Sequence, residues 1–333
     1  MNRLTTILLA SVFMFPFNLL GDENTSPSLA SPFNLEGPTF GGKQIWTDEV
    51  VFHEWRIQRN SLSGHCRLLD DKNFRKAWGS FAHCQKQLEA FKRDLELPPM
   101  EGKAVIVLHG LVRSRQATVG MCDYLRKQGN YLIVNVSYAS TRERVERHAK
   151  SLASVIDHLG PGVTEINFVA HSLGNLVIRH YLGDQLAAED RQPDPRIKRI
   201  VMLAPPNNGS QFAVKFTNNK IFQTIWGTSG LQLAKDWKAL EQRLATPSQE
   251  FGIIAGGRGK DNGSNPILDG DDDFVVSIEE TRLPGARDFV VLPVLHSLVM
   301  DDPKTREYTL RFLWHGYFVS QDERAPIPLQ REE

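Results

Sequence analysis

Six apolar runs recur along the later two-thirds of the chain, and they share a length of four or five residues. They lie at 104–108, 131–134, 166–170, 200–204, 251–254 and 289–292. Strands that are apolar on both faces are typical of a parallel sheet covered by helices. Segments with helical spacing separate these runs, for example 141–159. The alternation predicts an α/β fold with a doubly wound, mostly parallel sheet.

The segment before the first run, residues 31–99, has a different pattern and forms an N-terminal strand-helix arm in this interpretation. Its start, 31–48, is rich in Pro, Gly and Ser and is typical of an exposed lead-in. Alternating apolar and polar residues predict a strand at 50–58, and helical spacing predicts a helix at 72–95. We expect the strand to extend an edge of the main sheet and the helix to cover one face. Residues 100–320 then form the α/β domain.

The extreme N-terminus predicts export. A basic start with Arg3 precedes the uncharged stretch 4–20, and polar residues and a small-x-small cleavage site at 28–30 follow. This order is typical of a secretory signal peptide, here residues 1–30, and it predicts a periplasmic or secreted protein. An alternative is an uncleaved membrane anchor through residues 4–20, because their number reaches the lower limit for a membrane span.

Composition narrows the class of protein. The chain has 333 residues, of which 41% are hydrophobic and 23% charged, so a sizeable core is expected and disorder is not. Its 39 Lys and Arg balance 39 Asp and Glu, and no basic run appears, which argues against nucleic acid as a partner. The three cysteines are Cys66, Cys84 and Cys122. The sequence leaves open whether Cys66 and Cys84 form a disulfide or the cysteines are buried free thiols.

The strongest chemical motif is Ala170-His171-Ser172-Leu173-Gly174. An apolar strand leads into it, and a segment with helical character follows. This context predicts a nucleophile elbow, a tight strand-to-helix turn that exposes a reactive serine. The turn requires small residues two positions before and two after Ser172, and Ala170 and Gly174 meet that need. Ser172 is therefore the predicted nucleophile.

Two backbone N–H groups are the expected donors to an oxyanion. The first is that of Leu173, directly after the serine at a helix start. The second is that of Leu111, because Gly110 lets the chain turn sharply after the strand ending at Leu108. His109 stands at the end of that strand beside Gly110, where we expect it to brace the loop rather than to act as a base.

Taken together, these motifs resemble those of α/β-hydrolases of the bacterial lipase and esterase type. The matching pieces are the strand and loop at 107–111, the Ala-x-Ser-x-Gly elbow, the Pro-x-x-Gly-Ser turn within 203–210, the acidic turn at 269–276, and His296. The resemblance covers roughly residues 100–316 and does not include the arm. It implies a triad in the chain order Ser, acid, His.

The resemblance places the acid in the cluster Asp271-Asp272-Asp273. Asp273 is favoured because Asp273-Phe274-Val275-Val276 is similar to the Asp-Gly-x-Val of such lipases, with Phe in place of Gly; Asp271 and Asp272 stay open. His296 follows the last apolar run, where the triad histidine belongs. The rivals are His315, inside an apolar terminal helix, and His171, whose side chain is expected to point away from the nucleophile.

This triad predicts a serine hydrolase that cleaves carboxylic esters through an acyl-enzyme, without a metal or an organic cofactor. An apolar insert at 211–248 resembles a lid, and Phe212, Phe222 and Trp226 are candidates for a substrate wall. Such a wall favours lipid or other acyl esters, a role in lipid metabolism and contact with a membrane surface. A thioesterase or acyltransferase on the same triad is one alternative, and a non-catalytic binding module is another. Oligomeric state stays open.

Overall fold

The computed structural model describes residues 37–38, 44–188, 194–259 and 263–329. Residues 1–30, for which the sequence predicts a signal peptide or an anchor, lie outside these ranges. Within the described ranges, no helix combines the length and the apolar character that crossing a membrane requires.

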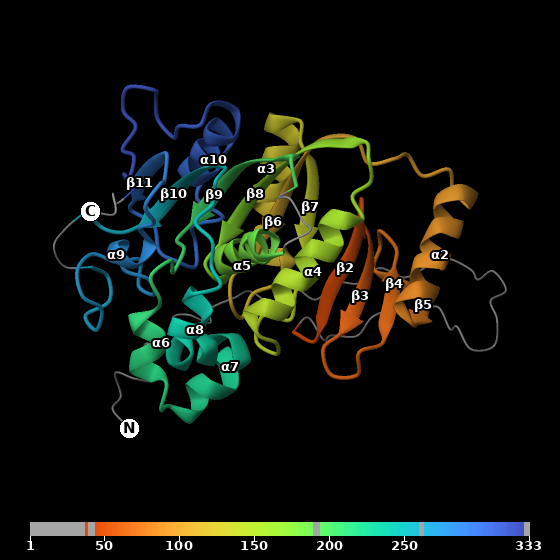
Figure 1. Ribbon diagram of the computed structural model, residues 1–333, viewed down its shortest axis with the longest axis horizontal. Helices are drawn as coiled ribbons and strands as arrows, with labels where there is room; N and C mark the ends of the chain where they lie inside the picture. Colours follow the sequence, from red (N-terminus) through yellow and green to blue (C-terminus); the bar gives the residue numbers. More distant parts are fainter. Residues whose placement is uncertain (1–36, 39–43, 189–193, 260–262, 330–333) are drawn as a thin grey trace. The chain divides into compact units, whose positions relative to one another are not determined.

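A six-stranded sheet forms the centre of the fold, and every neighbouring pair in it is parallel (Figure 1). Its strands in spatial order are β11 (Asp288–Leu292), β10 (Glu250–Gly256), β9 (Ile197–Leu203), β8 (Val163–His171), β6 (Gly102–Leu108) and β7 (Leu132–Val136). Each predicted apolar run corresponds to one of these strands. The predicted α/β fold with a parallel sheet is therefore confirmed.

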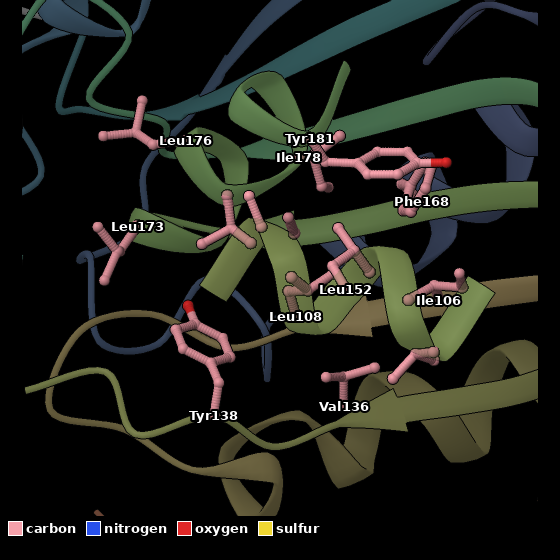
Figure 2. Close-up of a cluster of buried hydrophobic side chains, with 14 of the residues drawn as sticks. Ile106, Leu108, Val136, Tyr138, Leu152, Phe168, Leu173, Leu176, Ile178 and Tyr181 are labelled. Atoms are coloured by element: carbon pink, nitrogen blue, oxygen red, sulfur yellow. The ribbon is translucent and has the colours of Figure 1, made fainter. Parts of the chain in front are cut away.

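Helices cover both faces of this sheet. On one face, Ile106 and Leu108 of β6 belong to the same buried cluster as residues of α4 (Val145–Asp157) and α5 (Leu173–Ala187) (Figure 2). On the other face, Val105 of β6 joins a cluster with residues of α3 (Val119–Gly129) and α10 (Pro303–His315). Burial on both sides explains why the strands are apolar at consecutive positions.

The predicted lid-like insert, 211–248, contains three helices, α6 (Gln211–Phe216), α7 (Lys220–Lys235) and α8 (Trp237–Glu241). Helix α7 is kinked at Gly227, whose φ of 59° and ψ of −151° are not helical. The chain passes so close to Thr141 here that a Cβ atom at Gly227 would lie 1.9 Å from the Thr141 carbonyl oxygen. Only glycine fits this crossing.

The arm forms an antiparallel sheet of its own and one helix. The strands in spatial order are β1 (Gly37–Pro38), β5 (Phe74–Gly79), β4 (Cys66–Leu69), β3 (Trp55–Asn60) and β2 (Trp46–Phe52), followed in the chain by α2 (Phe81–Asp94). The remaining short helices are η1 (Arg115–Thr118) and α9 (Ile278–Thr281).

Two predicted elements of the arm are wrong in their extent. The strand predicted at 50–58 is a hairpin of β2 and β3 that turns at His53, whose φ is 52°. The turn has neither glycine nor asparagine, so the sequence carried no hairpin signal there. The helix predicted at 72–95 begins only at Phe81, because the Ser80 hydroxyl caps it by accepting the His83 N–H at 3.2 Å, and β5 precedes it.

The arm does not extend the main sheet, so that expectation is also wrong. Its strands are joined in succession and pair with one another instead. The link to the main sheet lies at the end of β7, where the Asp48 and Ser137 segments exchange two hydrogen bonds of 2.8 and 2.6 Å. Glu49 adds an ion pair of 2.7 Å with Arg147 of α4. The arm is thereby fixed beside the carboxyl end of β7.

All three cysteines are buried free thiols, which decides between the two alternatives left open for Cys66 and Cys84. Burial raises the pKa of Cys84 and of Cys122 to about 12. These thiols are protonated near neutral pH and are not reactive nucleophiles.

Candidate active site

Ser172 stands between β8 and α5 in a strained conformation. Its φ of 53° and ψ of −121° lie in a region that residues other than glycine rarely occupy. The Ser172 N–H donates to the Leu203 carbonyl at 2.9 Å, which holds the turn against β9. A Cβ atom at Gly174 would lie 2.9 Å from Leu108 Cβ, and Ala170 is fully buried, so neither position has room for a larger residue.

Asn175, a side chain that sequence reasoning missed, stabilises the turn at Ser172. It is fully buried, and its Nδ2 group donates to the carbonyl oxygens of Ser172 at 3.0 Å and Leu203 at 3.3 Å. A single polar residue within the apolar segment 173–178 was the available signal. Asn175 links the strained turn to the neighbouring strand.

The loop after β6 passes directly beside Ser172. A Cβ atom at Gly110 would lie 3.1 Å from Ser172 Cβ and 2.9 Å from Nδ1 of His171, so glycine is required for this approach. Leu111 follows Gly110 in the same loop. Leu173 is the first residue of α5, where backbone N–H groups have no partner within the helix. The two N–H groups predicted to bind an oxyanion thus lie on segments that meet at Ser172.

His109 is fully buried and supports this loop through its ring nitrogens. Its Nδ1 donates to the Gly110 carbonyl at 2.8 Å, and its Nε2 accepts the Tyr138 N–H at 3.3 Å. Its ring stacks on that of Tyr138, with centroids 4.2 Å apart. Burial lowers the pKa of His109 to about 4, so the ring is neutral at pH 7.

The structure brings Asp273 and His296 into direct contact. The Asp273 Oδ2 atom lies 2.7 Å from His296 Nδ1, and the Asp273 side chain is fully buried. Its Oδ1 atom accepts the N–H groups of Val275 at 3.0 Å and Val276 at 2.8 Å. The His296 N–H donates to the Asp273 carbonyl at 2.9 Å, so backbone and side chain both position the pair.

The neighbouring acids have other roles. Asp271 accepts the N–H groups of Arg258 and Gly259 at 2.7 to 3.0 Å. Asp272 is fully buried and accepts the Asn265 N–H at 3.0 Å, which stabilises the loop. Of the three acid candidates, Asp273 is the one in contact with His296.

The two rival histidines also have clear positions. His315 ends α10, where its ring stacks on Tyr317 with centroids 5.4 Å apart. The ring of His171 lies against that of His296, with centroids 4.6 Å apart, which sequence reasoning did not anticipate. Burial lowers the pKa of His171 well below its usual value, and repulsion from His296 lowers it further. His171 is therefore a neutral ring that packs against His296.

The candidate substrate-wall residues form an aromatic cluster in the insert. Phe212 and Phe222 are almost fully buried, and both stack on the ring of Trp226, with centroids 5.3 and 4.6 Å away. The insert reaches the loop after β6 at Gly230, where a Cβ atom would lie 3.3 Å from Leu111 Cδ2. The cluster and the loop after β6 therefore adjoin the same helix, α7.

Across the part of the chain that the structure describes, no group of three His, Cys, Asp or Glu side chains is arranged to hold a metal ion.

Comparison with known proteins gives a family match. Residues 97–267, just over half of the chain, match the model of a family described as an alpha/beta hydrolase of unknown function (DUF915). No curated protein matches the chain.

Three solved structures are similar to parts of the chain. Lipase BlEst2 of Bacillus licheniformis in its mature form is 20% identical with a TM-score of 0.46, covering 61% of this chain and 88% of the lipase. Phospholipase PlaB of Legionella pneumophila is 17% identical with a TM-score of 0.43, covering 54% and 45%. A hydrolase from Oleispira antarctica is 12% identical with a TM-score of 0.45, covering 64% and 91%.

Proposed function

The chain belongs to this α/β hydrolase family, as its motifs predicted, and on that premise we propose that it is a serine hydrolase of carboxylic esters. Ser172 is the nucleophile, His296 the general base and Asp273 the acid of the triad. The observation that carries the proposal is the 2.7 Å contact between the buried Asp273 carboxylate and His296 Nδ1, with the His296 ring packed against His171, the residue before the strained Ser172.

The mechanism follows from this geometry. Asp273 accepts the Nδ1–H of His296, which leaves Nε2 free to take the Ser172 proton. Ser172 Oγ then attacks the ester carbonyl, and the N–H groups of Leu111 and Leu173 stabilise the oxyanion. His296 protonates the leaving alcohol, and water repeats the sequence to release the acid from the acyl-enzyme.

His171 contributes by packing. Because its ring is buried and neutral, it adds no positive charge beside the imidazolium that forms on His296 during each step. A charged neighbour at that distance would disfavour the proton transfer from Ser172.

The surroundings of the site favour an apolar acyl group. Leu295 and Leu298, on either side of His296, are 44% and 52% exposed. On the insert, Val214 and Ile221 are 52% and 47% exposed. In this proposal, exposed apolar side chains on the loop that carries His296 and on the insert are the surface that an acyl chain, or a lipid aggregate, would contact.

A fluorophosphonate probe and p-nitrophenyl esters of increasing acyl length test the proposal. We expect labelling of the wild type, loss of labelling in Ser172→Ala and His296→Ala, and a fall in kcat of about 10³-fold or more in both variants. Ser151→Ala is the matched control, because Ser151 is a buried serine on α4 outside the proposed site and should keep full activity. Absence of labelling in folded wild-type protein would refute the proposal. A preference for long acyl chains would identify a lipase, and turnover of thioesters alone would replace the ester assignment.

A further inference from the structure

A cavity of about 280 Å³ lies between the arm sheet and residues 114–116, which follow the loop after β6. The arm lines it with Arg56, Arg67 and Gln58, and the other side contributes Ser114 and Arg115. Three arginines and no Asp or Glu are among its lining residues. Neither the proposed triad nor the two oxyanion residues line it, so this cavity is separate from the ester site.

The two arginines from the arm donate to uncharged partners. Arg56 is only 4% exposed; it donates to the amide oxygen of Asn73, and its Nε has no partner. Arg67 donates from Nε and Nη2 to the Gln58 amide oxygen at 3.0 and 2.7 Å. Its guanidinium lies 3.9 Å from the centroid of the Trp46 ring, which fixes the plane of its donors. Both side chains are held in place, yet no carboxylate accepts their hydrogen bonds.

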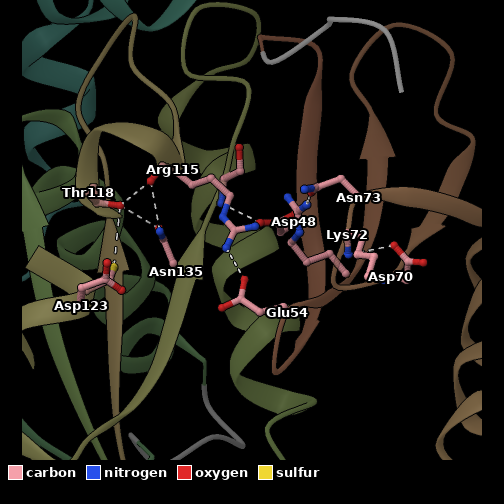
Figure 3. A network of polar contacts seen from close by, with 12 residues as sticks. Asp48, Glu54, Asp70, Lys72, Asn73, Arg115, Thr118, Asp123 and Asn135 are labelled. Carbon is pink, nitrogen blue, oxygen red and sulfur yellow. Dashed lines mark hydrogen bonds and ion pairs between the residues drawn. The ribbon is translucent and has the colours of Figure 1, made fainter. Parts of the chain in front are cut away.

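Two carboxylates, those of Asp48 and Glu54, lie close to these arginines and attract them. Arg115 donates to Glu54 at 2.7 Å, but its buried Nε has no partner (Figure 3). The fully buried Asp48 already accepts two hydrogen bonds, from Gln58 at 2.7 Å and from the Ser137 N–H at 2.6 Å. Three guanidinium groups therefore line the cavity beside two carboxylates, and the Nε–H groups of Arg56 and Arg115 are buried without a partner.

Burial is the largest influence on the two arginines from the arm. Burial and repulsion from Arg56 lower the pKa of Arg67 to about 10, although Asp48 attracts its charge. Burial also lowers the pKa of Arg56, against attraction from Asp48 and with added repulsion from Arg115. Burying a charged group costs free energy, and a partner of opposite sign in the cavity would offset that cost.

We propose that this cavity binds the phosphate or carboxylate group of an anionic ligand. Guanidinium groups bind such oxyanions through several N–H donors, and Arg56, Arg67 and Arg115 line the cavity from two sides. The hydroxyl of Ser114 adds a neutral donor at the rim. The volume suits one small anionic group. A free anion and the headgroup of an anionic lipid offer the same chemistry.

Thermal unfolding and titration calorimetry with inorganic phosphate test this site without any need for catalysis. We expect phosphate to raise the Tm by about 2–4 °C above sodium chloride of equal ionic strength. In Arg67→Gln that shift should vanish and the phosphate affinity should fall about tenfold or more. Arg282→Gln is the matched control, because Arg282 is an exposed arginine whose partner, Glu279, lies outside the cavity.

Equal shifts with phosphate and chloride would overturn the proposal, and so would an undiminished phosphate shift in Arg67→Gln. If Arg67→Gln does not fold, Arg115→Gln replaces it with the same expected loss. The source of the anion is a separate readout. Co-sedimentation with phosphatidic acid vesicles that inorganic phosphate competes away would support a lipid headgroup, and phosphate binding without such co-sedimentation would support a free anion.

Discussion

Replacing Asp273 with asparagine separates the chemistry of the proposed triad from its packing. The amide has the size of the carboxylate, and its oxygen can still accept the N–H groups of Val275 and Val276, at 3.0 and 2.8 Å in the native protein. Its NH₂ group, however, then faces His296 Nδ1 at the position now 2.7 Å away. Nδ1 must become an acceptor, so the proton moves to Nε2 and the ring can no longer take the Ser172 proton.

The expected loss follows from that change of tautomer. A triad whose histidine is held in the wrong tautomer loses about 10⁴ in kcat, which corresponds to about 5 kcal/mol of transition-state stabilisation. Folding should change much less, because two of the three hydrogen bonds of the side chain are retained. Steady-state hydrolysis of a p-nitrophenyl ester measures the first quantity, and urea unfolding measures the second.

Asp272→Asn is the matched control for this experiment. Asp272 is the adjacent buried carboxylate, but its contacts are backbone N–H groups of Asn265 and Phe274. We expect Asp272→Asn to lower the stability and to keep kcat within about tenfold of the wild type. Full activity in Asp273→Asn, or a collapse of kcat in folded Asp272→Asn alone, would refute the assignment of the acid.

Three further predictions concern stability, and urea unfolding measures each of them. Gly227→Ala should destabilise the protein by at least ~2 kcal/mol, because its Cβ would collide with the Thr141 carbonyl. The control Gly64→Ala, at a similar positive φ with no atom within 4 Å, should cost only about 1 kcal/mol. Equal costs would refute the close contact between Gly227 and Thr141. Asn175→Ala should cost about 1–3 kcal/mol, since two carbonyl oxygens at the elbow lose their donor; an unchanged midpoint would show that Asn175 does not hold the turn. The pKa of His109 falls on folding from 6.5 to about 4, so its contribution to stability is complete above about pH 6.5 and is lost as the pH falls toward 4, by roughly 3 kcal/mol. His109→Asn should flatten this dependence between pH 6.5 and 4, and a slope as steep as that of the wild type would exclude His109 as its source.

The main sheet could be predicted from sequence because each of its strands is apolar on both faces and is separated from the next by a helix. That pattern depends on burial alone, which the side chains record directly. The elbow could be predicted for a related reason. Ala170 and Gly174 are local requirements of one tight turn, so they appear at fixed spacing around Ser172.

The arm and the supporting contacts could not be predicted in the same way. The hairpin at His53 lacks the residues that usually mark a turn, so one alternating pattern continued through two strands. The contact between the rings of His171 and His296 joins residues 125 positions apart and arises only when β8 and the last loop meet. The arginine cavity likewise joins the arm to residues after β6, and no local pattern signals it.

Four of the eight non-glycine residues with positive φ in the described ranges lie near the carboxyl ends of the main-sheet strands. Val112, Ser172, Ala204 and Phe274 all have φ between 45° and 87°, and they lie after β6, β8 and β9 and in the acid loop. Each such residue costs of order 1–3 kcal/mol, so together they are comparable to the net stability of a typical domain. Substitutions at the carboxyl ends of these strands should therefore raise the thermal stability only by relaxing the geometry that the proposed chemistry needs. Substitutions at the amino ends of the strands, or in the arm, should raise the stability without that loss of activity.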